Sequence, residues 1–142
     1  MALYHIQSTC AESDIGLKIC GYCSALESLF STSNAELTHQ LSERLAFFIS
    51  GLPQERLEIY KKAKQAYSVR SRIVHGGLIG EKELANIKEL SYFCDSSLRK
   101  VIFKLMSDEN AKNHFSGKFE LVDDYMQKLI FGVYVHDNSA LL

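Results

Sequence analysis

An arginine and a histidine five residues apart are the two side chains in this sequence best suited to chemistry. Arg70 and His75 lie in the run Tyr67-Ser68-Val69-Arg70-Ser71-Arg72-Ile73-Val74-His75-Gly76-Gly77. A guanidinium is always charged and binds phosphoryl oxygens, whereas an imidazole takes up and releases a proton near neutral pH. Together they offer what phosphodiester chemistry needs. One group transfers a proton, and the other is a cation beside the phosphoryl oxygens on which negative charge builds up.

The helical pattern around Arg70 places it on an apolar face. At 100° per residue it falls within the arc of four residues that are expected to pack inward: Tyr60, Ala63, Tyr67 and Val74. An unpaired buried guanidinium is very costly, so Arg70 needs a carboxylate, a phosphate or a subunit boundary. The alternative is an arginine whose stem packs on the core while its head reaches water.

His75 stands at the expected end of the same helix, before Gly76 and Gly77. Five residues rotate by about 140°, so Arg70 and His75 converge only if the helix ends at His75 and the glycines redirect the chain. The negative end of the helix dipole favours an imidazolium at this position. The alternative is a histidine that only caps the helix by donating to a carbonyl.

The elements that position this pair are expected to be helices. The chain has 142 residues, 46% of them apolar, with one Pro and eight Gly, which favours one domain of long helices over a turn-rich β-sandwich. Apolar residues at three- and four-residue steps predict helices, with a short helix or turn over 108–115. The predicted helices cover residues 13–30, 34–50, 53–75, 80–106 and 118–130. The sequence therefore predicts an all-α, antiparallel bundle of about five helices.

The predicted helix ends are set by capping residues: Ser13 or Asp14, Ser33 or Asn34, Gly51 and Pro53. Residues 1–11 lack a clear period and are expected to form a lead-in segment. Residues 12–135 are expected to form the helical domain, and residues 136–142 a flexible tail. Residues 131–135 have the pattern of a short strand, but a lone strand has nothing to pair with.

Composition and charge limit the classes of function that this sequence favours. The net charge is −1, from 16 Lys and Arg against 17 Asp and Glu, so a positive field over the whole chain is absent. Residues 55–72 hold six cations and two anions, which either bind a few phosphates or form a solvated helix face. No run is apolar enough for a membrane span and no signal peptide is recognised, so a cytoplasmic location with four reduced cysteines is expected.

With these residues, the sequence resembles the HEPN superfamily of helical domains, many of which are ribonucleases. Arg70-x4-His75 matches the R-x4-6-H signature of that superfamily. Three further segments resemble its Apea-like branch: Ala25–Phe30, Leu41–Phe47 and Tyr67–Gly76. The resemblance covers residues 12–131. It implies a helical bundle that forms a homodimer and brings two such motifs into one cleft.

The resemblance also implies an activity. Catalytic members cleave RNA without a metal ion or other cofactor: the ribose 2′-hydroxyl attacks the adjacent phosphate, leaving a cyclic phosphate and a 5′-hydroxyl. It makes His75 the general acid or base and Arg70 the group that binds the transition state. After the Arg the superfamily usually has Asn, Asp or His, but this chain has Ser71, which cannot act as a base. That departure favours the alternative, a non-catalytic module that binds RNA or a partner and dimerises within a larger defence or stress protein.

Other residues are expected to support this pair. Glu27 flanks the first predicted helix stripe and is placed to reach Arg70 or His75, the alternative being a solvated carboxylate. Tyr67 precedes Arg70 by about one turn and is suited to stack on a base or to pack in the core. The cations expected to contact RNA phosphates are Arg44, Arg72 and Lys64. The Cys20-Gly-Tyr-Cys23 pair is not expected to bind a metal, since no second ligand pair follows at zinc spacing.

Overall fold

The computed structural model describes residues 1–134, which form an all-α bundle as predicted. Seven α-helices are described in this part of the chain, where about five were predicted. Their bounds are α1 Ala2–Ala11, α2 Ile15–Phe30, α3 Leu37–Ile49, α4 Pro53–Val74, α5 Glu81–Ser107, α6 Glu109–Phe115 and α7 Phe119–Ile130. Between residues 1 and 134, no helix combines the length and apolarity that crossing a membrane requires.

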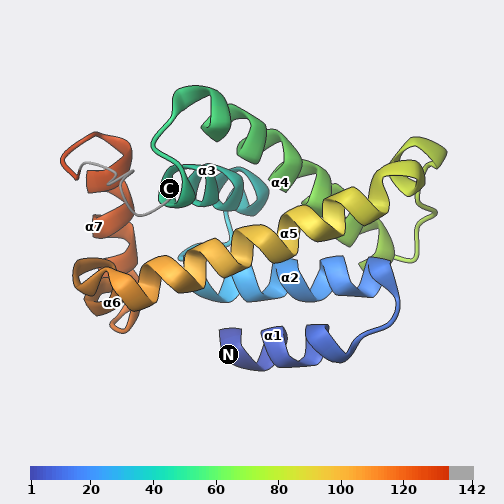
Figure 1. Cartoon of the computed structure of the whole chain (residues 1–142), viewed down its shortest axis with the longest axis horizontal. Coiled ribbons are helices and arrows are strands. Elements are labelled where there is room, and N and C mark those ends of the chain that lie inside the picture. The colour runs from blue at the N-terminus through green and yellow to red at the C-terminus, as the bar shows by residue number, and fades with distance from the viewer. Residues whose placement is uncertain (135–142) are drawn as a thin grey trace.

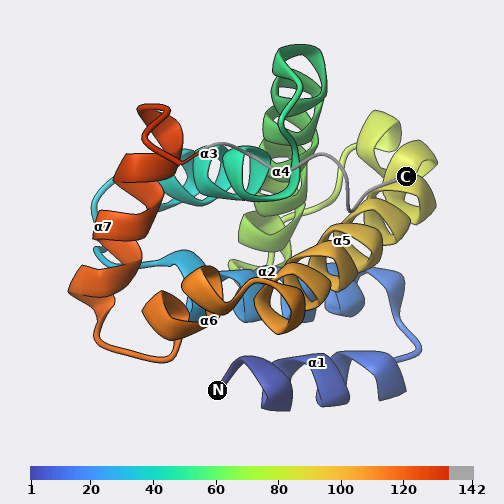
Figure 2. The same ribbon diagram turned by 60° about the vertical axis from the view of Figure 1, so that its left-hand side comes forward.

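Helix α2 lies at the centre of the bundle and contacts α1, α3, α4 and α5 (Figure 1). Its inward residues are fully or nearly buried: Ile19, Tyr22, Cys23, Ala25, Leu26 and Phe30. The two views show α2 and α5 running side by side in the same direction, with α1 antiparallel to α2 (Figures 1 and 2). A helix that is surrounded on several sides must be apolar over most of its circumference, and the residues of α2 meet this requirement.

Residues 1–11, for which the sequence predicts only a lead-in segment with no clear period, contain helix α1, which packs on the bundle. The helix packs on α2 where Thr9, which is buried, lies against Gly21. A side chain at Gly21 would overlap the Thr9 hydroxyl, so the absence of a side chain there permits the close approach of the two helices. The sequence pattern gave little sign of α1 because Met1, Leu3 and Tyr4 are exposed and blur its apolar stripe.

The helix ends follow the capping residues in most places. Asp14 caps α2 by accepting a hydrogen bond from the backbone N–H of Leu17 at 2.8 Å, and Pro53 is the first residue of α4. The predicted cap at Ser33 or Asn34 is wrong. Helix α3 begins after Glu36, which adopts a left-handed conformation with φ 50°, so the chain turns sharply before Leu37 and no side chain caps that helix.

Helices α6 and α7 close the bundle near the start of α3 and the end of α5 (Figure 2). An aromatic cluster joins them to the core: Phe30, Phe48, Phe115 and Tyr125 stack edge-on or tilted, with ring centroids 5.2–6.1 Å apart. Residues 131–134 form turns, not a strand, and no strand is described in residues 1–134 with which one would pair. The last residue of that strand pattern and the predicted tail 136–142 lie outside the described residues.

Candidate functional site

The end of α4 holds the pair that the sequence singled out. The helix stops in a Schellman motif: Gly76 donates to the Ile73 carbonyl at 3.1 Å and Gly77 donates to the Arg72 carbonyl at 2.7 Å. Gly76 has φ 70°, a conformation that glycine adopts without strain. This turn ends the helix at His75, whose imidazole is exposed at the helix terminus.

Arg70 faces α2 and meets Glu27, which is one of the alternatives that the sequence left open. Its Nη2 atom lies 3.2 Å from Glu27 Oε1 and donates a hydrogen bond to Oε2 at 3.3 Å. The side chains are 29% and 22% exposed respectively, so the pair sits at the edge of the core. The carboxylate thus satisfies the guanidinium that the helical pattern places on an apolar face, while part of the guanidinium still reaches solvent.

Arg70 and His75 do not converge within one chain. The backbone N–H of His75 still donates to the Ser71 carbonyl at 3.1 Å, so helical geometry continues to His75 and the glycines redirect the chain only beyond it. The two side chains therefore leave α4 about 140° apart. Over residues 1–134 the structure describes no contact between them, and the His75 side chain has no partner there.

The two residues that follow Arg70 are both exposed, and they differ in their contacts. Ser71 carries its hydroxyl on the outer face of α4. Arg72, predicted to contact phosphate, pairs with Glu83 at the start of α5, and the same carboxylate accepts a hydrogen bond from the Gly80 backbone at 3.2 Å. Arg72 therefore holds the α4–α5 connection in place, which fixes the position of His75 beside it.

Two predicted site residues are structural. Tyr67 is 5% exposed and its hydroxyl donates to the Cys23 carbonyl at 2.9 Å, so it supports Arg70 by packing and is not accessible to a base. Arg44 is 7% exposed and is occupied by Asp123 and by the Phe30 carbonyl, which accepts its hydrogen bond at 2.6 Å. The expectation of an RNA-phosphate contact at Arg44 is corrected, since its guanidinium joins α3 to α7 inside the protein.

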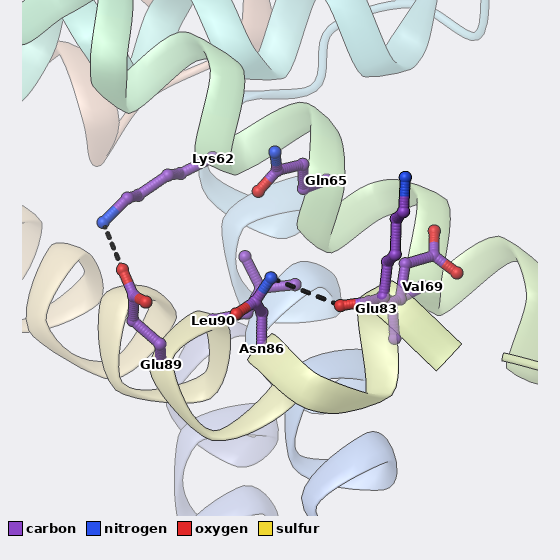
Figure 3. A pocket seen from close by; sticks show the side chains of 8 residues that line it. Lys62, Gln65, Val69, Glu83, Asn86, Glu89 and Leu90 are labelled. Atoms are coloured by element: carbon purple, nitrogen blue, oxygen red, sulfur yellow. Dashed lines mark hydrogen bonds and ion pairs between the residues drawn. The ribbon is translucent and has the colours of Figure 1, made fainter. Parts of the chain in front are cut away.

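Within residues 1–134, three of the six cations in the segment 55–72 form ion pairs with carboxylates: Lys62, Arg70 and Arg72. Lys62 pairs with Glu89 at 2.9 Å across a cleft of about 500 Å³ between α4 and α5, whose floor includes Val69 and Leu90 (Figure 3). Lys64 is exposed and lies over the Tyr60 ring, away from the end of α4. Helix α4 therefore does not carry a continuous strip of cations for phosphate binding, because neighbouring carboxylates neutralise Arg70, Arg72 and Lys62.

A second histidine that sequence reasoning did not select lies near Glu27. His5 of α1, half-buried, lines a cavity of about 620 Å³ together with Glu27, Ser24, Ser28 and Asn34. Glu27 Oε1 is buried and, among residues 1–134, accepts no hydrogen bond. The sequence carried no signal for His5, because its position depends on α1 packing against α2.

The cysteines near this region are shielded. Burial raises the pKa of the Cys23 thiol well above its usual value, and the neighbouring Cys94 and Cys20 add to this. Burial also raises the pKa of Cys20, although the Arg70 charge opposes the shift in part. Both thiols are thereby kept in the protonated form, which is a poor nucleophile and metal ligand. Within residues 1–134, His, Cys, Asp and Glu side chains nowhere gather in threes that could hold a metal ion.

No protein-family model, no curated protein and no solved structure matches the chain.

Proposed function

We propose that this chain is a HEPN-type domain that cleaves RNA without a metal ion, in a site that a second copy of the chain completes. The observation that carries the proposal is the end of α4, where Glu27 holds Arg70 at the edge of the core and a Schellman motif presents His75 to solvent. The resemblance of the Arg70–His75 segment to the HEPN signature points to the same two residues.

The Arg70–Glu27 pair suits a group that binds charge during a reaction. Glu27 fixes the direction of the guanidinium, and Arg70 has five N–H donors, of which one is used in the described contact. The remaining donors are available for phosphoryl oxygens as negative charge develops on them. A guanidinium already aligned by a carboxylate needs little reorganisation when the substrate binds.

The second copy is needed because of helix geometry. Arg70 and His75 point about 140° apart on one helix, so one chain alone does not place both beside one phosphate. A two-fold axis near the end of α4 brings the Arg70 of one protomer towards the His75 of its partner. The pairing of residues across the axis then generates two identical sites.

In this site the reaction is an internal transfer. His75, as general base, accepts the proton of the ribose 2′-hydroxyl; the O2′–P bond forms, the P–O5′ bond breaks, and the leaving 5′-oxygen takes a proton from water. His75 afterwards returns its proton to solvent. The products are a cyclic phosphate and a 5′-hydroxyl. Arg70 stabilises the charge on the non-bridging oxygens.

A non-catalytic function is the second candidate, and two observations favour it. Ser71 stands exposed where catalytic HEPN domains usually have a stronger polar group, and the Arg70 charge is already paired with Glu27. In that function the end of α4 serves as a binding and dimerisation surface of a larger, cytoplasmic defence or stress protein.

The test is RNA cleavage in the presence of EDTA. The wild-type chain is expected to cut unstructured RNA to products with cyclic phosphate ends, and His75→Ala and Arg70→Ala each to lower the rate by about 10²-fold or more. Arg99→Ala is the matched control, since Arg99 is exposed and, within residues 1–134, its ion pair is with Asp95 on its own helix. Wild-type protein that dimerises but leaves diverse RNAs intact would contradict the nuclease and support the second candidate.

A further inference from the structure

A groove between α3 and α4 combines aromatic rings with two cations, Arg56 and Lys64, that form no ion pair within residues 1–134. We name it the α3–α4 groove. Its first part is a cavity of about 390 Å³ lined by Phe47, Leu57, Tyr60, His39, Glu43 and Arg56. Its second part is a cavity of about 530 Å³ lined by Lys64, Thr38 and Glu36. His39 lines both parts and so joins them.

The rings and cations of the groove are arranged in pairs. The Arg56 guanidinium lies 4.2 Å from the centre of the Phe47 ring, and Lys64 Nζ lies 5.4 Å from the centre of the Tyr60 ring. His39 Nδ1 and the Tyr60 hydroxyl share a hydrogen bond of 3.0 Å. On α4 the three residues Arg56, Tyr60 and Lys64 follow at four-residue steps, so they share one face over about 12 Å.

The cations in this groove differ from the others on α4. Lys62, Arg70 and Arg72 each have a carboxylate partner, whereas among residues 1–134 neither Arg56 nor Lys64 forms an ion pair. Arg56 uses its Nε to donate to the Ser50 carbonyl at 2.8 Å, which leaves its terminal nitrogens without a described acceptor. Unpaired cations over half-buried aromatic rings are the features that recognise a phosphorylated planar ligand.

We propose that the α3–α4 groove binds a nucleoside 5′-monophosphate unit. The base lies in the first cavity against Phe47 and Tyr60, and the phosphate lies in the second cavity against Lys64 and His39. Glu43 is the acidic group of the first cavity, and it accepts a hydrogen bond from an exocyclic amine of the base. The groove therefore prefers adenine, cytosine or guanine to uracil, which lacks that amine.

The second cavity also limits how many phosphates of the ligand the groove can bind. Lys64 is the only Lys or Arg among the residues that line this cavity, and the nearby Glu36 carboxylate repels any additional phosphate charge. One phosphate contacts Lys64 and His39, while further phosphates gain no additional cation among the residues that line this cavity. The groove is therefore expected to bind adenosine triphosphate no more tightly than adenosine monophosphate.

The site is independent of the nuclease proposal. It uses residues 56–64 of α4, whereas Arg70 and His75 lie at the end of that helix, so we expect variants of one site to leave the other intact. The ligand is either a free nucleotide or the phosphorylated 5′ end of an RNA strand, since both carry the same chemistry.

The experiment is a titration of the full chain with adenosine monophosphate, followed by amide NMR shifts. We expect saturable shifts at residues 39, 43, 47, 60 and 64, and binding about tenfold weaker for adenosine, which lacks the phosphate. Lys64→Ala is expected to weaken binding of the monophosphate by about tenfold and binding of adenosine much less. Lys61→Ala is the matched control, because Lys61 is exposed on the same helix and lines neither cavity.

The outcomes separate the interpretations. If a 5′-phosphorylated oligoadenylate binds more tightly than the monophosphate, the natural ligand is the 5′ end of an RNA strand; if it binds more weakly, the natural ligand is a free nucleotide. Either result supports a nucleotide-binding site in the α3–α4 groove. Equal affinities for adenosine and its monophosphate, no saturable shift in the groove, or equal losses in Lys61→Ala and Lys64→Ala would overturn it. Uridine monophosphate binding as tightly as the adenine nucleotide would remove the role given to Glu43.

Discussion

Glu27 and Arg70 are 43 residues apart in the sequence, and they meet with Arg70 Nη2 3.2 Å from Glu27 Oε1. This contact joins the central helix to the end of α4 and decides where the guanidinium points. It also leaves one oxygen of Glu27 buried without a hydrogen bond within the described part of the chain, beside a cavity that His5 lines. The pair therefore joins two helices and also places a charged group at the proposed site.

Removing the charge of Glu27 tests the structural side of this contact. Glu27→Gln is expected to lower the free energy of unfolding by about 1 kcal/mol, because Arg70 loses its ionic partner at a partly buried position. Urea denaturation measures the change. The matched control is Glu89→Gln, which breaks the more exposed pair with Lys62 and is expected to cost at most about 0.5 kcal/mol. Equal losses in the two variants would show that Glu27 does not hold Arg70.

Acid sensitivity is expected to depend on Asp123. Burial raises the pKa of Asp123, but hydrogen bonds from Thr32 and Arg44 and the Arg44 charge outweigh this, so its net pKa lies below the usual value. Its contribution to stability is therefore complete above the unfolded pKa of about 4 and is lost as the pH falls through the lower folded value.

Asp123→Asn tests this dependence. The variant is expected to be less stable by about 1 kcal/mol at pH 7, since Asp123 is partly exposed, and to differ less from the wild type below pH 4. Urea denaturation over a pH series measures both effects. The neighbouring Asp124→Asn is the control, because Asp124 faces Lys128 on its own helix and His114 of α6, so its loss leaves the Arg44 contact intact. A stability difference that stays constant across the acid range would contradict this explanation.

Because Thr9 and Gly21 approach so closely, we expect a side chain at position 21 to disrupt the packing of α1 on α2. Gly21→Ala puts a methyl group into the Thr9 hydroxyl, so we expect a loss of about 1–3 kcal/mol and faster hydrogen exchange in α1 than in α2. Combining it with Thr9→Gly is expected to restore part of the packing. Gly77→Ala is the control, since a methyl there meets only ordinary contacts. Unchanged exchange in α1 would show that the helix does not depend on this approach.

The regular part of the fold was predictable because it is local. Helical spacing of apolar residues gave α2, α4, α5 and α7 nearly to the residue, since burying one face of a helix requires that spacing. Helix α1 was missed because its packing depends on Thr9 fitting against Gly21, a complementarity that periodicity does not express. The start of α3 was misplaced because Glu36 adopts a left-handed conformation that its residue type does not suggest.

The candidate site was predictable in part, for a related reason. The wheel position of Arg70 required a partner, and Glu27 was among the residues suited to supply it. The role of Arg44 was wrong because its partner Asp123 is 79 residues away, and such a pairing depends on how α7 docks against α3. A local pattern identifies a group that needs a partner, but the packing of helices decides which partner it obtains.

The central claim is that Arg70 of one protomer and His75 of its partner form one site, and mixing two inactive variants tests it directly. Arg70→Ala and His75→Ala chains are each expected to lack RNA cleavage in EDTA. Unfolded and refolded together, they form mixed dimers with one intact site, so activity is expected to return to roughly a quarter of the wild-type value under random pairing. Mixed dimers that form but remain inactive would contradict a site shared in this way.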